Sequence, residues 1–294
     1  MLEISLSAEK VGAIGGFPIT NSLLSTWLVM GILALIAFLV GRKVTLIPSY
    51  AQSMAEIVIQ GLYDFFESVM GHTIKKAFPV LGSLFLFIIV ANWMGLLPGV
   101  GTIGLYEEVE KEAPIHIEEK QEIPVGGTTS EGLHEGNQTE VQEIPTETIS
   151  VPEPIQEEKA EAEKKFIPLF RGATADLNMT IALAIISFLA IQYFGFTTIG
   201  IHYSLRFFNF SNPIMLFVGL LEIVSDLSKI ISFAFRLFGN IFAGEVLLAV
   251  MAFLMPFIAP MPFLLLELFV GFIQALVFST LTAVFINVAV AHEG

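Results

Sequence analysis

Long apolar runs dominate the hydrophobic pattern of this chain. Residues 23–41 form an almost uninterrupted apolar stretch, and about 19 helical residues at about 1.5 Å each cross a hydrocarbon core of roughly 30 Å. Four further runs, at 78–99, 174–198, 213–256 and 262–291, are long enough to do the same. The pattern predicts an all-α integral membrane protein with five membrane-crossing helices.

A different periodicity appears at residues 48–71. Apolar residues recur there at helical spacing, and Glu56, Gln60, Asp64 and Glu67 lie between them. An amphipathic helix of this kind lies in the membrane interface rather than across it. We therefore expect one interfacial helix between the first and second crossings.

Basic residues predict the orientation of the chain. Pairs of Lys or Arg stand at 42–43 and again at 75–76, on either side of the interfacial helix. Because cytoplasmic loops are enriched in Lys and Arg, the N-terminal segment 1–22 is expected outside and the C-terminus in the cytoplasm. A cleaved signal peptide is the competing interpretation of the first run, but Glu3 and Glu9 precede it, and signal peptides begin with basic residues.

Composition supports the membrane assignment and isolates one segment. The chain is 54% hydrophobic and 14% charged, with a mean hydropathy of +0.77, which is too apolar for a soluble domain of 294 residues. Without Cys, disulfides and thiolate metal sites are excluded. No basic stripe suggests nucleic acid.

The acidity of the chain belongs to an insert. Residues 107–165 hold 17 Glu, no Asp and 5 Lys, a net charge of −12 out of −14 for the whole chain. This Glu- and Pro-rich sequence predicts an external insert over 100–168 that is loosely ordered. A small hairpin or partner-binding strand near residues 115–125 is the alternative, and steering of cations by the acidic charge is conceivable.

The last two apolar segments are longer than upright crossings require. A continuous helix over 213–256 measures roughly 64 Å, and one over 262–291 roughly 45 Å. The expectation is a hairpin of two long, steeply tilted helices.

Charge inside these helices is their most informative feature. An ionised side chain at mid-bilayer costs at least about 2.5 to 3.5 kcal/mol, and Arg236 has no acidic residue within four positions. Lys229, Asn240 and Glu222 fall within about 40° of Arg236 on a helical wheel. Glu245 lies about 180° away and roughly 13.5 Å along the axis, so it cannot pair with Arg236 on the same straight helix. For the segment 222–229, snorkelling and an Asp226–Lys229 pair are a structural alternative.

The final helix repeats this theme. Glu267 and Gln274 are seven residues apart, so they share one face and can meet Glu245 or Asn240 across the hairpin. Amides often join membrane helices, which is the structural alternative for Asn240 and Gln274. For the carboxyl groups of Glu245 and Glu267, a proton relay is favoured.

Together these residues resemble subunit a of the rotary F-type ATP synthase. The resemblance rests on RLFGN at 236–240, AGE at 243–245, NWMGLLPG at 92–99, TADLNMT at 174–180 and Gln274. It covers nearly the whole chain except the acidic insert, which departs from the compact form of the family.

This resemblance implies an ion-translocating stator subunit that is not itself catalytic and needs no cofactor. Its partners would be the c-subunit ring, b-type peripheral stalk subunits, the soluble catalytic head and the lipid of a bacterial inner membrane. Arg236 matches the essential arginine of the family. Proton-translocating roles extend to Asn240, Glu245, Glu267, Gln274 and Asp176 on the outer side and to Glu222 and Ser225 on the cytoplasmic side. Many relatives carry His where this chain has Glu267.

Three other classes remain as alternatives. A secondary transporter would normally show repeated halves, and none is visible. An intramembrane enzyme is disfavoured because HExxH and GxSxG are absent. A purely structural subunit would not need Arg236, Glu245 and Glu267 at such cost. Copurification with a small two-span subunit carrying a buried carboxyl would distinguish these classes.

Overall fold

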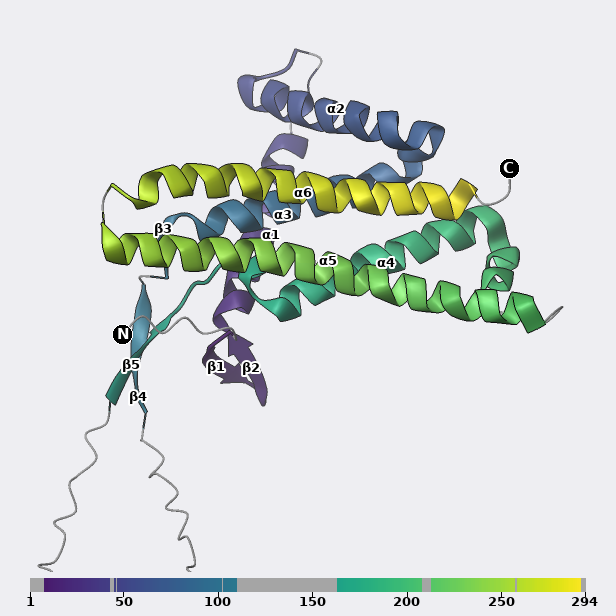
Figure 1. The fold of residues 1–294 in the computed structure, drawn as a ribbon. Helices are drawn as coiled ribbons and strands as arrows, with labels where there is room; N and C mark the ends of the chain where they lie inside the picture. The colour runs from purple at the N-terminus through teal and green to yellow at the C-terminus, as the bar shows by residue number, and fades with distance from the viewer. Residues whose placement is uncertain are drawn as a thin grey trace, which may run out of the picture. The chain divides into compact units, whose positions relative to one another are not determined.

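The computed structural model describes residues 8–42, 45, 47–101, 103–109, 163–207, 213–256 and 258–291 (Figure 1). Within these residues, five helical segments are long and apolar enough to cross a membrane. The predicted all-α membrane fold with five crossings is confirmed. Residues 110–162 lie outside the described residues, and with them the expectations of loose order and of a small hairpin in the acidic insert.

The helices and strands follow the chain in a simple order. The long helices are α1 (Asn21–Gly41), α2 (Tyr50–Met70), α3 (Ile74–Gly95), α4 (Leu177–Ile199), α5 (Pro213–Leu254) and α6 (Pro260–Ala291). Short 3-10 turns are η1 (Gly71–Thr73), η2 (Ala173–Ala175) and η3 (Gly200–Arg206). The strands are β1 (Lys10–Ile14), β2 (Phe17–Thr20), β3 (Pro98–Gly101), β4 (Gly104–Val109) and β5 (Glu163–Pro168).

Two small strand pairs were not predicted from the sequence. β1 and β2 form an antiparallel hairpin directly before α1, and β4 pairs with β5 in a second two-stranded sheet. The β1–β2 turn contains Gly15 and Gly16, with φ of 60° and 86°. Glycine adopts these positive φ angles at low cost, whereas other residues at these two positions would be unfavourable.

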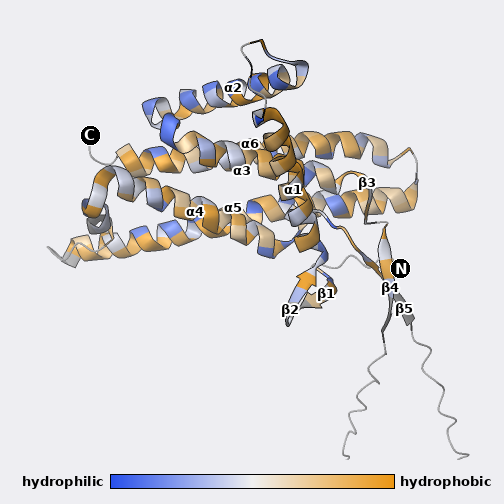
Figure 2. Cartoon of the chain, turned by 180° about the vertical axis from the view of Figure 1, so that it is seen from behind, coloured by the Kyte–Doolittle hydropathy of each residue, from blue (hydrophilic) through white to orange (hydrophobic). Residues whose placement is uncertain are grey.

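The helix α2 divides its apolar residues between protein and surroundings. It packs against α3 and α6, with Leu62, Phe66 and Met70 buried. Met54 and Ile57 remain exposed, and hydropathy colouring shows polar and apolar residues mixed along the helix (Figure 2). An amphipathic helix with exposed apolar side chains suits the predicted place at the membrane interface.

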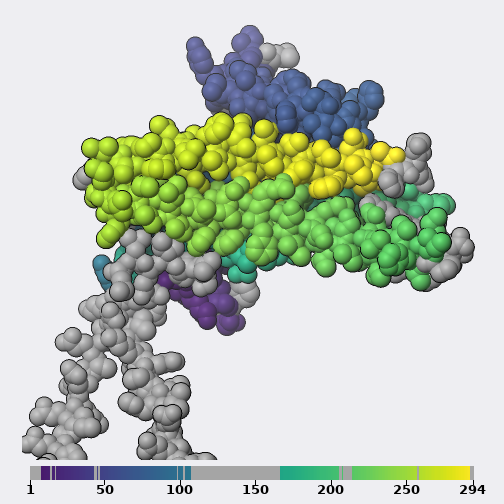
Figure 3. Space-filling view, viewed as in Figure 1, coloured from purple at the N-terminus to yellow at the C-terminus, as the bar shows by residue number. Residues whose placement is uncertain are grey.

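The last two helices form the expected hairpin. α5 and α6 lie side by side in opposite directions, joined by the short turn after Leu254, and together cover one face of the molecule (Figures 1 and 3). α1 crosses the direction of this hairpin in Figures 1 and 2. If α1 stands upright in a bilayer, α5 and α6 must be steeply tilted, which lets helices of 42 and 32 residues fit.

One buried core joins α3, α4, α5 and α6. Leu81, Ile88, Leu237 and Phe278 are almost completely buried within it. Lipid tails are as apolar as these side chains, so close packing rather than exclusion of water holds such helices together. The hydroxyls of Ser187 and Thr282, 2.6 Å apart, add a hydrogen bond between α4 and α6 inside the core.

A buried asparagine ties three elements together. The side-chain amide of Asn92 on α3 donates to the carbonyl of Gly271 on α6 (3.0 Å), and its oxygen accepts from the Thr174 hydroxyl in η2 (2.7 Å). Next to it, the indole N–H of Trp93 donates to the carbonyl of Leu268 (3.0 Å). These contacts fix the position of α6 against α3.

We predict that Asn92→Leu destabilises the subunit by about 1 kcal/mol, because it leaves the Thr174 hydroxyl without this acceptor in an apolar environment. Reversible unfolding in mixed micelles measures the change. Asn178→Ala, at an exposed position on α4, is the matched control and should unfold like the wild type. Equal stability of the Asn92 and Asn178 variants would show that the hydrogen-bonded asparagine contributes nothing.

Candidate functional site

The helix α5 presents two chemically different faces. Asp226, Phe233, Leu237 and Ile241 are buried against the rest of the chain. The opposite face is exposed and rich in small or polar residues. Its members are Ser225, Ser228, Ser232, Arg236, Gly239, Asn240 and Ala243. Small residues on a membrane helix allow a second helix to approach closely.

Arg236 lies on this exposed face. Among the residues that the structure describes, it has neither an ion pair nor a hydrogen bond. A Cβ added at Gly239 would meet nothing within 4 Å, so the surface beside the guanidinium is open. The chain therefore supplies no carboxylate to Arg236 from its described part.

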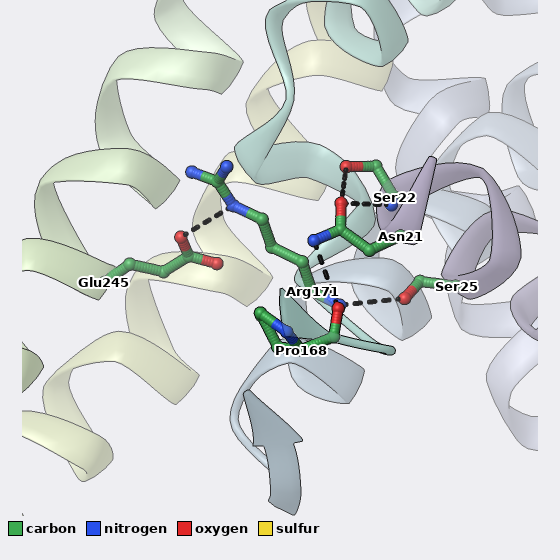
Figure 4. A network of polar contacts seen from close by, with 6 residues as sticks. All are labelled: Asn21, Ser22, Ser25, Pro168, Arg171 and Glu245. Carbon is green, nitrogen blue, oxygen red and sulfur yellow. Dashed lines mark hydrogen bonds and ion pairs between the residues drawn. The ribbon is translucent and has the colours of Figure 1, made fainter. Parts of the chain in front are cut away.

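Glu245 points in another direction, toward the segment that precedes α4. Its Oε2 lies 3.6 Å from Nε of Arg171, and the two side chains are 30% and 12% exposed (Figure 4). The backbone N–H of Gly172 also faces this carboxylate. Glu245 is thus paired with a residue 74 positions away and not with Arg236.

Glu267 on α6 meets α5 beside Glu245. Glu267 is 9% exposed, and its carboxyl group packs directly against Gly244, where a Cβ would overlap it. Because Gly244 directly precedes Glu245, the Glu267 carboxyl lies beside the backbone that carries Glu245. Within the described residues, Oε1 of Glu267 has no hydrogen-bond partner. Buried polar atoms of this kind are unusual in structural contacts and are found at functional sites.

An amide pair continues this polar contact along the hairpin. Nδ2 of Asn240 donates to Oε1 of Gln274 at 2.8 Å, and Gln274 is 3% exposed. The structure therefore brings three predicted residues, Asn240, Glu267 and Gln274, to the α5–α6 contact, with Glu245 next to it on α5. The contact between Asn240 and Gln274 confirms that these two residues meet across the hairpin.

A second polar cluster lies farther toward the N-terminal end of α5. Asp226 forms an ion pair with Lys229 (2.6 Å), as the i, i+3 spacing suggested, and accepts a hydrogen bond from Gln192 on α4 (2.9 Å). The Lys229 ammonium also lies over the ring of Phe285 on α6, 4.9 Å from its centroid. This cluster joins α4, α5 and α6.

The remaining predicted residues are Glu222, Ser225 and Asp176. Glu222 is half-buried and Ser225 exposed, about 21 Å and 16 Å from Arg236 along α5. Asp176 is buried and caps α4, since its Oδ1 accepts from the N–H of Asn178 at 3.0 Å. A carboxylate at a helix N-terminus satisfies free N–H groups there, so Asp176 has a structural task as well.

Sequence reasoning missed Arg171, Thr174 and Gln192. The available signal for Arg171 was a lone cation three residues before the TADLNMT motif, in front of an apolar helix. Thr174 begins the TADLNMT motif, but nothing in the sequence indicated its contact with Asn92. Gln192 gave no signal, because single polar residues in apolar helices are common. The described residues contain no group of three His, Asp or Glu able to hold a metal ion.

Comparison with known families bears directly on this arrangement. The family model described as ATP synthase A chain matches residues 23–287, a range that begins within α1 and ends within α6. The chain belongs to the ATP synthase A chain family.

Family membership gives the coarse function of the site. Members of this family are proton-translocating subunits of the membrane sector of ATP synthase, and do not carry the catalytic site. With its five spanning helices, this ATP synthase A chain is a multi-pass membrane protein of that complex. The charged residues of α5 and α6 therefore lie in a protein whose task is to move protons.

We predict that Gly244→Ala lowers ATP-driven proton pumping about tenfold, because misplacing a functional group by about 1 Å can cost up to a hundredfold. The added methyl would overlap the Glu267 carboxyl and push it away from α5. Gly31→Ala on α1, where a Cβ meets nothing within 4 Å, is the control. Pumping is measured in inverted vesicles with equal amounts of complex. Unchanged pumping by Gly244→Ala would mean that the place of Glu267 is unimportant.

Proposed function

We propose that this chain provides two offset half-channels that pass protons to and from the ring of c subunits, and so couples proton flow to rotation and ATP synthesis. The observation that carries the proposal is Arg236 on the exposed face of α5, without an ionic partner in the described part of the chain. The exposed surface beside it includes the small residues Ser232 and Gly239.

An exposed arginine on an apolar helix needs a partner from another protein. A lipid-facing guanidinium near mid-bilayer costs at least about 2.5 to 3.5 kcal/mol, and a carboxylate on a facing helix removes that cost. The buried carboxyl of a c subunit is the natural partner. Because the guanidinium does not deprotonate in proteins, Arg236 attracts a ring carboxylate without relaying its proton. It therefore acts as the barrier between the half-channels.

The outer half-channel is formed by Asn240, Glu245, Glu267 and Gln274. Asp176 also belongs to this outer half-channel. Support comes from the contacts of Asn240 with Gln274 and of Glu267 with Gly244 between α5 and α6, and from the buried oxygen of Glu267, which has no hydrogen-bond partner among the described residues. Glu245 lies about 13.5 Å along α5 from Arg236, and a ring carboxyl receives its proton between these depths. Carboxyl groups serve here because they can take up and release protons.

The cytoplasmic half-channel uses the other end of α5. Glu222 and Ser225 lie roughly 16 to 21 Å from Arg236 on the side away from Glu245. A proton released near Arg236 leaves along this polar face. The two paths are thus separated by the arginine and joined only through rotation of the ring.

The complex around this subunit follows from the same proposal. Besides the c-ring, the partners are b-type peripheral stalk subunits, which hold the stator, and through them the soluble catalytic head. The subunit resides in a bacterial inner membrane, with its N-terminus outside and its C-terminus in the cytoplasm.

Arg236→Ala should reduce the rate of ATP-driven proton pumping to below about a hundredth of the wild-type rate. Loss of one charged group from a water-excluded site typically slows a reaction by about this factor. Passive proton leak after removal of the soluble head should rise, because the barrier is gone. Arg42→Ala, at the exposed end of α1, is the matched control and should pump normally. Normal pumping by an assembled Arg236→Ala complex would contradict the stator mechanism.

The orientation can be tested with single cysteines, because the natural chain has none. Lys10→Cys should react with a membrane-impermeant maleimide in intact spheroplasts. Ser49→Cys and Ala291→Cys should react only in inverted vesicles. All three positions are exposed. Labelling of Ser49→Cys from outside would reverse the proposed topology.

A further inference from the structure

Arg171 is a charged residue at the candidate site that the sequence patterns did not predict. It follows β5 and precedes η2, and its side chain is 12% exposed. Its Nε lies 3.6 Å from the Glu245 carboxylate (Figure 4). No other ion pair joins α5 to the segment between β5 and α4 within the described residues.

The backbone around Arg171 is held by the first turns of α1. The N–H of Arg171 donates to the Ser25 hydroxyl (3.2 Å), and Nδ2 of Asn21 donates to the carbonyl of Pro168 (3.3 Å). The Asn21 oxygen in turn accepts from the N–H of Ser22 at 2.9 Å (Figure 4). The segment 168–171 is thereby fixed at both ends.

The first turns of α1 are unusual for a membrane helix. Asn21, Ser22, Ser25 and Thr26 are each at most 5% exposed, although the rest of α1 is apolar and largely exposed. Buried polar side chains are costly unless their hydrogen bonds are made. Asn21 and Ser25 make theirs to the segment that carries Arg171, while the hydroxyls of Ser22 and Thr26 bond within α1. Asn21 and Ser25 thus have a role that spanning the membrane does not require.

The residue after Arg171 completes the contact. A Cβ at Gly172 would lie 2.7 Å from Oε1 of Glu245, so the carboxylate packs against the backbone where the glycine lacks a side chain. The Gly172 N–H faces the same carboxylate. Two successive residues therefore hold Glu245 from one side, while Glu267 brings a second carboxyl group from α6.

We propose that Arg171 is a positioning residue of the outer half-channel, which holds the Glu245 carboxylate in place and offsets its repulsion with Glu267. This rests on the proposed function of Glu245 and Glu267. Without Arg171, two neighbouring carboxyl groups would face each other in a poorly hydrated site, where like charges repel strongly. Ser25 and Asn21 act one step farther away, by fixing the backbone from which the arginine reaches α5.

The test compares two substitutions of Arg171 in the complete ATP synthase complex. Arg171→Gln should slow ATP-driven proton pumping roughly tenfold, within the range of couplings between contacting residues. Arg171→Lys keeps the positive charge and should pump within about threefold of wild type. Rates are normalised to assembled complex in inverted vesicles. Wild-type pumping by Arg171→Gln, or equal losses in the two variants, would overturn the proposal.

A second comparison asks whether Arg171 acts through Glu245. Glu245→Asp keeps a carboxyl group but shortens its reach. If the pair acts as a unit, adding Arg171→Gln to Glu245→Asp slows pumping less than the product of the two single losses. Losses that multiply would show that Arg171 acts elsewhere, and would overturn the proposal.

If Arg171→Gln prevents assembly, Ser25→Ala provides the decisive variant. It keeps both charges and removes only the hydroxyl that accepts from the Arg171 N–H. We expect about a twofold loss of pumping, and unchanged pumping would contradict the role of this scaffold. Arg42→Gln, an exposed arginine at the end of α1, is the charge-matched control and should have no effect.

Arg236→Ala, measured in parallel, distinguishes failure of the proposed role of Arg171 from failure of the proposed stator mechanism. Loss of pumping in Arg236→Ala with normal pumping in Arg171→Gln refutes only the role of Arg171. Normal pumping in Arg236→Ala refutes the stator mechanism itself, whatever Arg171→Gln does.

Discussion

Charge in an apolar solvent is the constraint on which this structure depends. A charged group that crosses a membrane must find a counter-charge, a hydrogen-bond partner or water. Inside the chain, Glu245 finds Arg171, and Asp226 finds Lys229 and Gln192. Arg236 is different, because the described residues offer it no partner. The same rule that explains the internal pairs therefore demands an external one at Arg236.

The length of α5 turns this constraint into a separation of depths. A helix of 42 residues carries the Asp226 cluster, Arg236 and Glu245 at successive levels, with about 13.5 Å between the last two. Its rotation per residue places Arg236 on the exposed face and Glu245 toward the interior. A single rigid helix thus separates its polar groups both along its axis and around it. Two unconnected access paths require such a separation.

Local patterns in the sequence were sufficient for the fold and for part of the site. Apolar runs predicted five crossings, and the excess length of 213–256 predicted the hairpin. Helical spacing predicted the Asp226–Lys229 pair and the meeting of Asn240 with Gln274. Contacts between distant segments were out of reach. Glu245 and Arg171 are 74 residues apart, and no periodicity relates them. The Asn92 contacts were missed for the same reason, since tertiary packing determines them. The β1–β2 hairpin was missed although its Gly15–Gly16 turn is a local signal.

The acidic insert ends six residues before Arg171 in the sequence. Hydrogen bonds join the two ends of the insert, so the site around Arg171 need not depend on it. Gly101 N–H donates to the carbonyl of Phe170 (2.9 Å), and Leu169 N–H donates to that of Ile103 (2.9 Å). β4 and β5 pair directly beyond these contacts. Because the two ends are fastened to each other and to Asn21 and Ser25 of α1, added length between them costs little and leaves the ends in place. The backbone around Arg171 is thus held by the Ser25 hydroxyl of α1 and by the closed base of the insert.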